Sequence, residues 1–153
     1  MKTDYRIDVT SFVQKLPLSP KRIVNIVETV LSDQKVRKAE ISVAVVGDKR
    51  MADFAQQYAH KRYRTDVFSF NLSEPGDSQW LGQIIVNSQL AREKAAKFKV
   101  EPGTELALYI VHGLLHLLGY DDHSVADANV MHRQTQKYLS TLGFKHIPPM
   151  PEV

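Results

Sequence analysis

Three histidines lie close together in the C-terminal third of the chain, within the segment VHGLLHLLGYDDHS. His112 and His116 are four residues apart, so on a helix their side chains leave the same face one turn apart, and the two imidazoles can share one metal ion. Leucines surround both rings. A polar ring without a partner is costly in such a place, and metal ligation satisfies both. The pair therefore predicts a metal site.

The third candidate ligand is His123, which follows the turn that ends this helix. Gly119 can adopt the left-handed conformation that breaks a helix, and residues 120–122 carry the chain back toward the first two histidines. The sequence has no cysteine, and three neutral imidazoles suit Zn²⁺, with nickel, copper and iron as alternatives. Three protein ligands leave a position for water, as in catalytic zinc sites. We predict a metal-dependent hydrolase with His112, His116 and His123 as ligands.

Asp121 and Asp122 directly precede the third histidine. An outer carboxylate commonly accepts the second N–H of a ligand histidine and so fixes its tautomer. A plain helix-terminating turn accounts for the two aspartates equally well, so both interpretations stay open at this point. His60, His132 and His146 have no second ligand at suitable spacing, and we interpret them as ordinary histidines.

The elements that must position this site alternate between strand and helix patterns. Strand patterns occupy residues 2–10, 41–46, 66–72 and 81–86. Helix patterns begin after Ser19, at Asp48, after Asn87 or Ser88, near residue 104 and after Ser124. The helix over 104–118 is apolar nearly all round, which predicts burial on most faces. With no repeat and no linker, one layered domain of sheet and helices is expected over residues 1–153, with a proline-rich tail from about residue 145.

Composition and charge narrow the classes of function. A hydrophobic content of 43% with 24% charged residues is ordinary for a globular domain. Residues 1–8 contain no apolar run, so no targeting peptide is expected, and no apolar stretch is long enough for a bilayer. We expect a cytoplasmic protein without a membrane partner. Residues 1–100 hold 17 Lys and Arg against 11 Asp and Glu, so basic clusters surround the histidines rather than form their site.

The segment from His112 to Asp121, HGLLHLLGYD, resembles the signature of the YbeY family of bacterial metal-dependent endoribonucleases. The blocks TDVFSF at 65–70 and LG at 81–82 resemble a second signature, and their order and spacing agree over nearly the whole chain. The resemblance implies an α+β fold with a four-stranded mixed sheet and about five helices, and zinc held by the three histidines. It also implies single-stranded RNA as substrate, with roles in 16S rRNA 3′-end maturation and in ribosome quality control at the small subunit. No DNA partner is expected.

Three positions depart from the usual pattern of this family. One residue more than usual precedes His123. Ala59 stands where the family carries an arginine, and we predict that Arg62 or Arg64 compensates by stabilising charge on the phosphorane. Gln83 stands where an aspartate is common, which removes one carboxylate base.

The predicted reaction is cleavage of an RNA phosphodiester, in which the metal activates water or polarises a phosphate oxygen. Basic clusters would hold phosphates, and Tyr58 or Tyr63 would stack a base, with core packing as the alternative for both tyrosines. Ala59 and Gln83 leave open a non-catalytic, zinc-stabilised module that binds RNA or the ribosome. A zinc peptidase is disfavoured, because Gly113 replaces the glutamate of the HExxH motif.

Overall fold

The computed structural model of the protein describes residues 2–148, and within them it contains four strands and five helices. In chain order these are β1 (Asp4–Ser11), α1 (Pro20–Asp33), β2 (Lys38–Val46), α2 (Asp48–Ala59), β3 (Val67–Asn71), β4 (Trp80–Asn87), α3 (Ser88–Phe98), α4 (Pro102–Leu117) and α5 (Val125–Thr141). Every strand and helix predicted from the sequence is confirmed, with ends shifted by a few residues. The part of the predicted tail beyond residue 148 lies outside the described residues.

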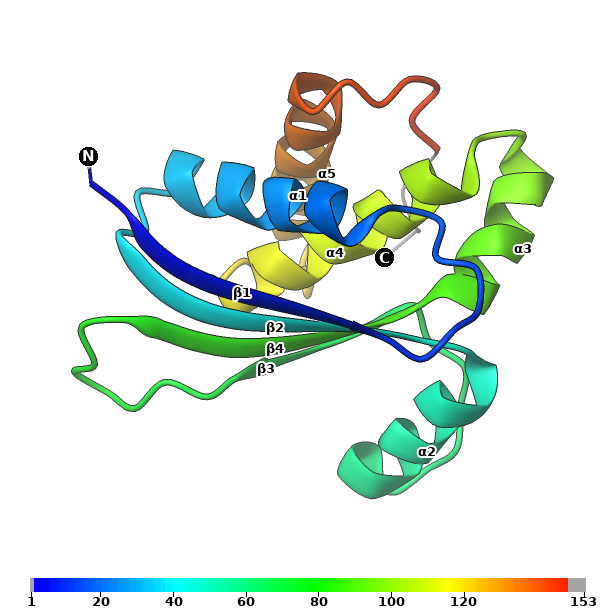
Figure 1. Ribbon diagram of the computed structural model, residues 1–153, viewed down its shortest axis with the longest axis horizontal. Coiled ribbons are helices and arrows are strands. Elements are labelled where there is room, and N and C mark those ends of the chain that lie inside the picture. Colours follow the sequence, from blue (N-terminus) through cyan, green and yellow to red (C-terminus); the bar gives the residue numbers. More distant parts are fainter. Residues whose placement is uncertain (1, 149–153) are drawn as a thin grey trace.

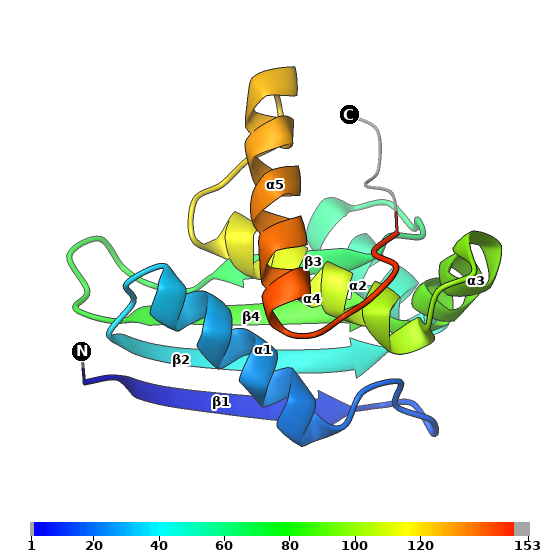
Figure 2. The same cartoon turned by 90° about the horizontal axis from the view of Figure 1, so that it is seen from above.

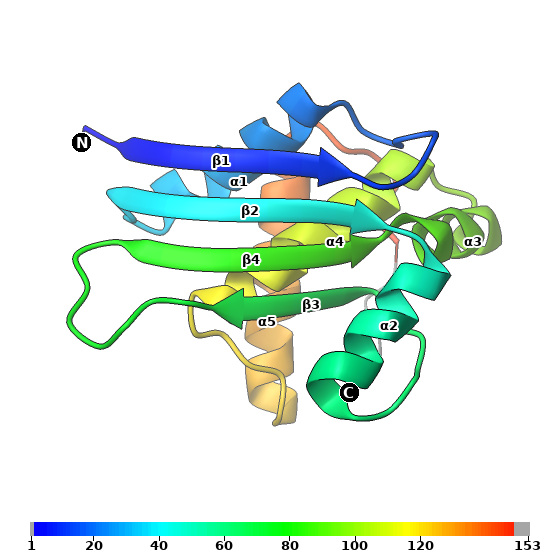
Figure 3. The same ribbon diagram turned by 60° about the horizontal axis from the view of Figure 1, so that its bottom comes forward.

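The strands form one mixed sheet in the order β1-β2-β4-β3 (Figure 3). Strands β1, β2 and β4 run parallel, and β3 is an antiparallel edge strand beside β4. Helices α1 and α4 cover one face, α5 crosses α4 (Figure 2), and α2 lies against the other face (Figure 1). This arrangement confirms the expected α+β fold with a four-stranded mixed sheet.

Local signals in the sequence explain where most helices begin and end. The side chains of Ser19, Asn87 and Ser124 accept backbone N–H groups at the starts of α1, α3 and α5. Gly119 has a φ of 104° just after α4, as its predicted role as a helix breaker requires. The helix pattern that begins at Asp48 also predicts that the Asp48 side chain caps α2, and this prediction is wrong. Gly47 is the N-cap of α2 and makes no side-chain bond, because the Asp48 carboxylate is instead engaged by long-range partners.

Helix α4 is the centre of the fold and contacts α1, α3, α5, β3 and β4. From Gly103 to Leu117, His112 and His116 are the two residues that are not buried. A helix apolar on every side must lie inside the protein, and these two polar rings are the points where it meets the surface. Within residues 2–148, no helix is both long and apolar enough to cross a membrane.

Gly113 allows α4 to approach the sheet closely. A Cβ atom at this position would lie 2.8 Å from Val67 Cγ2 and 3.0 Å from both Ile84 Cγ2 and Ser69 Oγ. The Ser69 hydroxyl also donates a 2.7 Å hydrogen bond to the Gly113 carbonyl. The helix is therefore fixed to β3 at the residue that follows His112.

Two buried polar side chains continue the line of the histidines along α4. Glu105 and Tyr109 are 3% and 1% exposed, and their spacing places them on the same helix face as His112 and His116. Glu105 Oε2 and the Tyr109 hydroxyl have no hydrogen-bond partner within residues 2–148. Burial raises the pKa of the Glu105 carboxyl and of the Tyr109 hydroxyl.

We expect Gly113→Ala to lower the free energy of unfolding by about 1 to 3 kcal/mol, because the added methyl group enters a filled space. Alanine favours a helix by about 1 kcal/mol over glycine, so any net loss comes from packing. Urea unfolding measures it. Adding Val67→Ala should restore part of the loss, since Val67 Cγ2 is the nearest obstacle. Independent effects of the two changes would contradict the packing argument.

We expect Glu105→Gln to raise the free energy of unfolding near neutral pH. Burial raises the pKa of Glu105 in the folded protein above its ordinary value of 4.5, so its favourable contribution is complete below that value and is lost as the pH rises through the folded-state pKa. The glutamine variant should therefore lose less stability as the pH rises. Urea unfolding at several pH values tests this, with the exposed Glu40→Gln as control. An unchanged pH dependence in Glu105→Gln would be the contrary result.

Candidate metal centre

The structure brings the imidazoles of His112 and His116 together in an edge-on arrangement, with ring centroids 4.6 Å apart and an angle of 63° between the ring planes. Their Nε2 atoms are 2.9 Å apart. The carboxylate of Asp122 completes the group, with Oδ2 at 3.9 Å from Nε2 of His112 and 3.8 Å from Nε2 of His116. These donor atoms all lie within 4.8 Å of one another. Two imidazoles and one carboxylate form a donor set typical of Zn²⁺ and of other divalent transition metals.

The turn after α4 fixes which nitrogen of His116 faces its neighbour. Nδ1 of His116 lies 3.2 Å from the Tyr120 carbonyl oxygen, which can only accept, so Nδ1 carries the proton and Nε2 keeps its lone pair. The left-handed conformation of Gly119 turns the backbone between the two residues. This is the arrangement that metal-binding histidines commonly show, and it supports a metal ion between the two rings.

The surroundings of His112 keep its ring neutral. Its side chain is 13% exposed. Burial and, after it, the neighbouring His116 lower the pKa of His112. A neutral imidazole is the form that binds a metal, so the electrostatics of this residue agree with the donor geometry.

His123 does not belong to this group of donor atoms. Its side chain is exposed, and its backbone N–H donates to Asp121 Oδ1 over 3.3 Å. The residue added before His123 lengthens the turn by one position, and Asp122 takes the place beside the two imidazoles. From sequence, Asp122 is expected only as an outer carboxylate or as a turn residue. The role of His123 as a ligand stays a prediction.

The donor atoms open into a cavity of about 390 Å³ beside the edge strand. Its lining consists of Asp66, Val67, Phe68, Ser69, His112, His116 and Asp122. Access from solvent distinguishes a site that meets a substrate from a closed structural site. The TDVFSF block thus forms one wall of the cavity, while the helix and the turn form the other.

Asp66 is a site residue for which sequence reasoning proposed no role. Its Oδ1 accepts the N–H of Val67 over 2.8 Å. Its charge adds to the rise in the pKa of Glu105 and of Tyr109 that burial causes, and partly offsets the lowered pKa of His112. The carboxylate therefore lies near the polar line of α4. In the sequence, its position in the TDVFSF block was the one feature that could have indicated a role at the site. The fold is needed to show that this block lies beside the histidines.

The two predicted catalytic arginines lie in ion pairs at the surface. Arg62 Nη1 is 2.7 Å from Asp53 Oδ1. Arg64 contacts Asp48 over 2.8 Å and Glu93 over 2.7 Å, and these two carboxylates raise its pKa. Neither arginine lines the cavity beside the histidines. Their catalytic role stays a prediction.

The two other departures from the family pattern lie away from the donor atoms. Ala59 is the exposed last residue of α2. On β4, Ile84 belongs to the core on the α4 side and Ile85 to the cluster on the α2 side. Because side chains alternate along a strand, Gln83 lies on the α2 side of the sheet, opposite to α4. A carboxylate at position 83 would thus face the aromatic side of β3, where Gln83 is paired with Phe70.

Aromatic side chains gather on that side of the edge strand. Tyr58 contacts Phe70 with ring centroids 4.8 Å apart, and Tyr63 meets Phe68 edge-on at 5.9 Å. Tyr58 remains 50% exposed and Tyr63 39% exposed. The two tyrosines therefore pack on one side and offer ring surface to solvent on the other.

Comparison with known proteins agrees with this fold and with these sequence blocks. The family model of Endoribonuclease YbeY matches residues 2–143. A protein of that name from Anaeromyxobacter sp. (strain Fw109-5) is 43% identical over 106 residues, which cover 69% of this chain and 55% of that protein. The Endoribonuclease YbeY of Thermodesulfovibrio yellowstonii is 32% identical over 89% of this chain and 96% of its own length. The chain thus spans about half of the first relative and nearly all of the second.

A solved structure has the same fold. The solution structure of TM1509 from Thermotoga maritima matches with a TM-score of 0.64, over 89% of this chain and 88% of that chain, at 24% sequence identity. The match over residues 2–143 and the relatives of the same name support an endoribonuclease role. The chain belongs to the Endoribonuclease YbeY family.

Proposed function

We propose that this protein is a single-strand-specific, metal-dependent endoribonuclease that acts in 16S rRNA 3′-end maturation and in ribosome quality control. One observation supports the proposal most strongly. In a chain of the Endoribonuclease YbeY family, the Nε2 atoms of His112 and His116 face each other at 2.9 Å in a cavity that is open to solvent. Small-subunit rRNA would be the partner and the cytoplasm the compartment.

The metal would be Zn²⁺ or another divalent cation, held by His112, His116 and one side chain of the turn at residues 121–123. The neutral ring of His112 and the lone pair on Nε2 of His116 fit such an ion. When bound, the ion supplies Lewis-acid chemistry at a phosphodiester group. Asp66 and Asp122 line the same cavity, where their carboxylates can accept a proton from water or from a ribose hydroxyl.

The surface beside the cavity supports a preference for single strands. Phe68 belongs to the edge strand that forms one wall of the cavity, and on the α2 side of this strand its ring is in edge contact with Tyr63, which is partly exposed. Exposed aromatic rings bind unstacked bases, with about 1 to 3 kcal/mol per base, and a paired duplex does not offer such bases. Arg62, which has a single exposed acidic partner, would exchange that partner for a phosphate of the strand.

A non-catalytic module that binds RNA or the ribosome is the second candidate. The ion pairs of Arg62 and Arg64 favour it, because a guanidinium held by carboxylates outside the cavity does not stabilise a transition state there. A zinc peptidase is disfavoured by packing as well as by sequence. A side chain at Gly113 would collide with Val67, Ile84 and Ser69.

We expect His116→Ala to lose both bound metal and cleavage of single-stranded RNA. Loss of a direct ligand should lower metal affinity by more than the roughly 10- to 100-fold that loss of an outer partner costs. Elemental analysis and an RNA cleavage assay measure the two losses, with His60→Asn as the control for an exposed histidine. Unchanged cleavage in a metal-free His116→Ala protein would contradict the proposal.

The third ligand can be identified by comparing Asp122→Asn with His123→Ala. We expect both changes to lower metal affinity, since one side chain would bind the ion and the other would support it. The direct ligand should show the larger loss, and the outer partner a loss of roughly 10- to 100-fold. Competition with a chelating dye measures the affinities. Wild-type affinity in both variants would show that the turn does not bind the metal.

We expect Arg62→Ala to slow RNA cleavage by at least about 10-fold. Its ion pair with Asp53 is exposed and screened by solvent, so the free energy of unfolding should barely change. Asp53→Ala is the matched control, because it breaks the same ion pair and leaves the guanidinium free. Cleavage that falls equally in both variants would show that the ion pair, and not the arginine, matters.

A further inference from the structure

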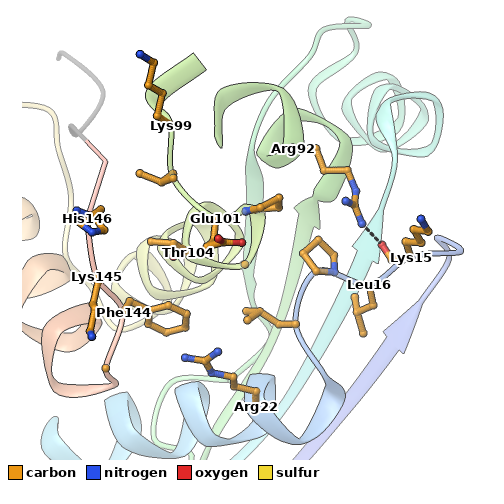
Figure 4. A pocket seen from close by; sticks show the side chains of 16 residues that line it. Lys15, Leu16, Arg22, Arg92, Lys99, Glu101, Thr104, Phe144, Lys145 and His146 are labelled. Atoms are coloured by element: carbon orange, nitrogen blue, oxygen red, sulfur yellow. Dashed lines mark hydrogen bonds between the residues drawn. The ribbon is translucent and has the colours of Figure 1, made fainter. Parts of the chain in front are cut away.

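A larger cavity, of about 850 Å³, is shown in Figure 4. Pro102, Gly103 and Thr104 at the start of α4 line it, whereas His112 and His116 lie in the C-terminal half of that helix. Residues from the loop before α1, from α3, from the start of α4 and from the segment after α5 line it. We call it the basic pocket after its cationic lining residues, which are Lys15, Arg22, Arg92, Lys99 and Lys145. None of the side chains that define it belongs to the metal centre.

The positive charges of the basic pocket are not neutralised by ion pairs. Among residues 2–148, none of its five Lys and Arg side chains lies in a salt bridge. Glu101 is the single carboxylate in the lining among these residues. Like charges gathered in a cavity raise the local potential and attract anions.

Two guanidinium groups are held in place by neutral partners. Arg92 Nη2 donates a 2.6 Å hydrogen bond to the Lys15 carbonyl oxygen, and the Arg22 guanidinium lies 4.3 Å from the centre of the Phe144 ring. In Figure 4 they approach the cavity from two sides. A carbonyl and an aromatic ring orient an arginine without cancelling its charge. Both groups keep free N–H donors suited to phosphate.

The backbone and one buried hydroxyl add donors to this pocket. The N-termini of α1 and α4 lie at it, since Leu18, Arg22, Pro102 and Gly103 are lining residues. The helix dipoles there add positive partial charge. Thr104 also lines the pocket and is 4% exposed. Its hydroxyl can donate a hydrogen bond to an anion that enters the cavity.

We propose that the basic pocket binds backbone phosphates of the RNA strand, as an anchoring site separate from the metal centre. This inference rests on the proposed ribonuclease function. Thr104 and His112 are eight residues apart on α4, a rise of about 12 Å, so a strand of several nucleotides can reach from one site to the other. The cationic side chains are distributed around the cavity and do not converge on one point (Figure 4). This distribution suits successive phosphates of a chain better than a single ion.

The test compares long and short RNA on the metal-loaded protein. Arg22→Ala/Arg92→Ala should weaken binding of a single-stranded RNA of about 20 nucleotides by about 10-fold or more. It should also reduce the slope of log affinity against log salt by about 0.7 for each phosphate that the protein no longer neutralises. Fluorescence anisotropy, read before turnover, measures both quantities. Cleavage of a trinucleotide, which is too short to occupy both sites, should keep the wild-type kcat.

Two further variants separate a local effect from a folding defect. Lys15→Ala/Lys145→Ala changes exposed side chains of the same pocket and should also weaken binding of the long RNA. Arg37→Ala removes an exposed cation that does not line the pocket and should leave binding unchanged.

Several results would overturn the inference. Wild-type affinity and salt slope in both pocket variants would show that the pocket does not hold the strand, although the wild type binds and cleaves RNA. Variants that lose binding of inorganic phosphate but keep RNA affinity would assign the pocket to a small anion. A wild type that neither binds nor cleaves RNA would refute the proposed function itself, and the inference with it.

Discussion

The close packing of α4 on the sheet is the constraint on which the metal centre depends. Gly113 brings the helix against Val67 and Ile84, and its carbonyl is tied to Ser69. His112 is the residue before Gly113, so its ring lies beside the helix–sheet contact and lines the cavity there. The same contact lays the start of β3, with Asp66, against the polar line of α4. A glycine thus sets the position of groups that it does not touch.

Helix α4 also relates the two candidate sites to each other. Its C-terminal half presents His112 and His116, and its N-terminus lies at the basic pocket. Since the helix is buried along nearly its whole length, it is a rigid spacer, and the separation of the two sites is fixed by the fold. The positive end of the helix dipole faces the cationic pocket, which strengthens the attraction for anions there.

Regular patterns made most of the fold predictable from sequence. The apolar periodicity and the caps at Ser19, Asn87 and Ser124 act within a few residues, as does the spacing of the histidine pair. Side chains that meet over long distances were not predictable. Arg64 forms an ion pair with Glu93, and Arg92 donates a hydrogen bond to the Lys15 carbonyl oxygen; both contacts join residues that are far apart in the sequence. The third ligand lies in a turn where one added residue decides between Asp122 and His123, and periodicity says nothing about such a turn.

Four arginines of this protein are held in two different ways, either by carboxylates or by neutral groups. Arg62 and Arg64 are paired with carboxylates, whereas Arg22 and Arg92 are held by a ring and a carbonyl and keep their full charge. The cavity at the histidines is lined by the carboxylates of Asp66 and Asp122 and by no arginine or lysine. Without a cation these carboxylates repel a phosphodiester, so the metal ion that we propose there would supply positive charge as well as Lewis acidity. In the proposed function, the basic pocket attracts the strand and the histidine site cleaves it.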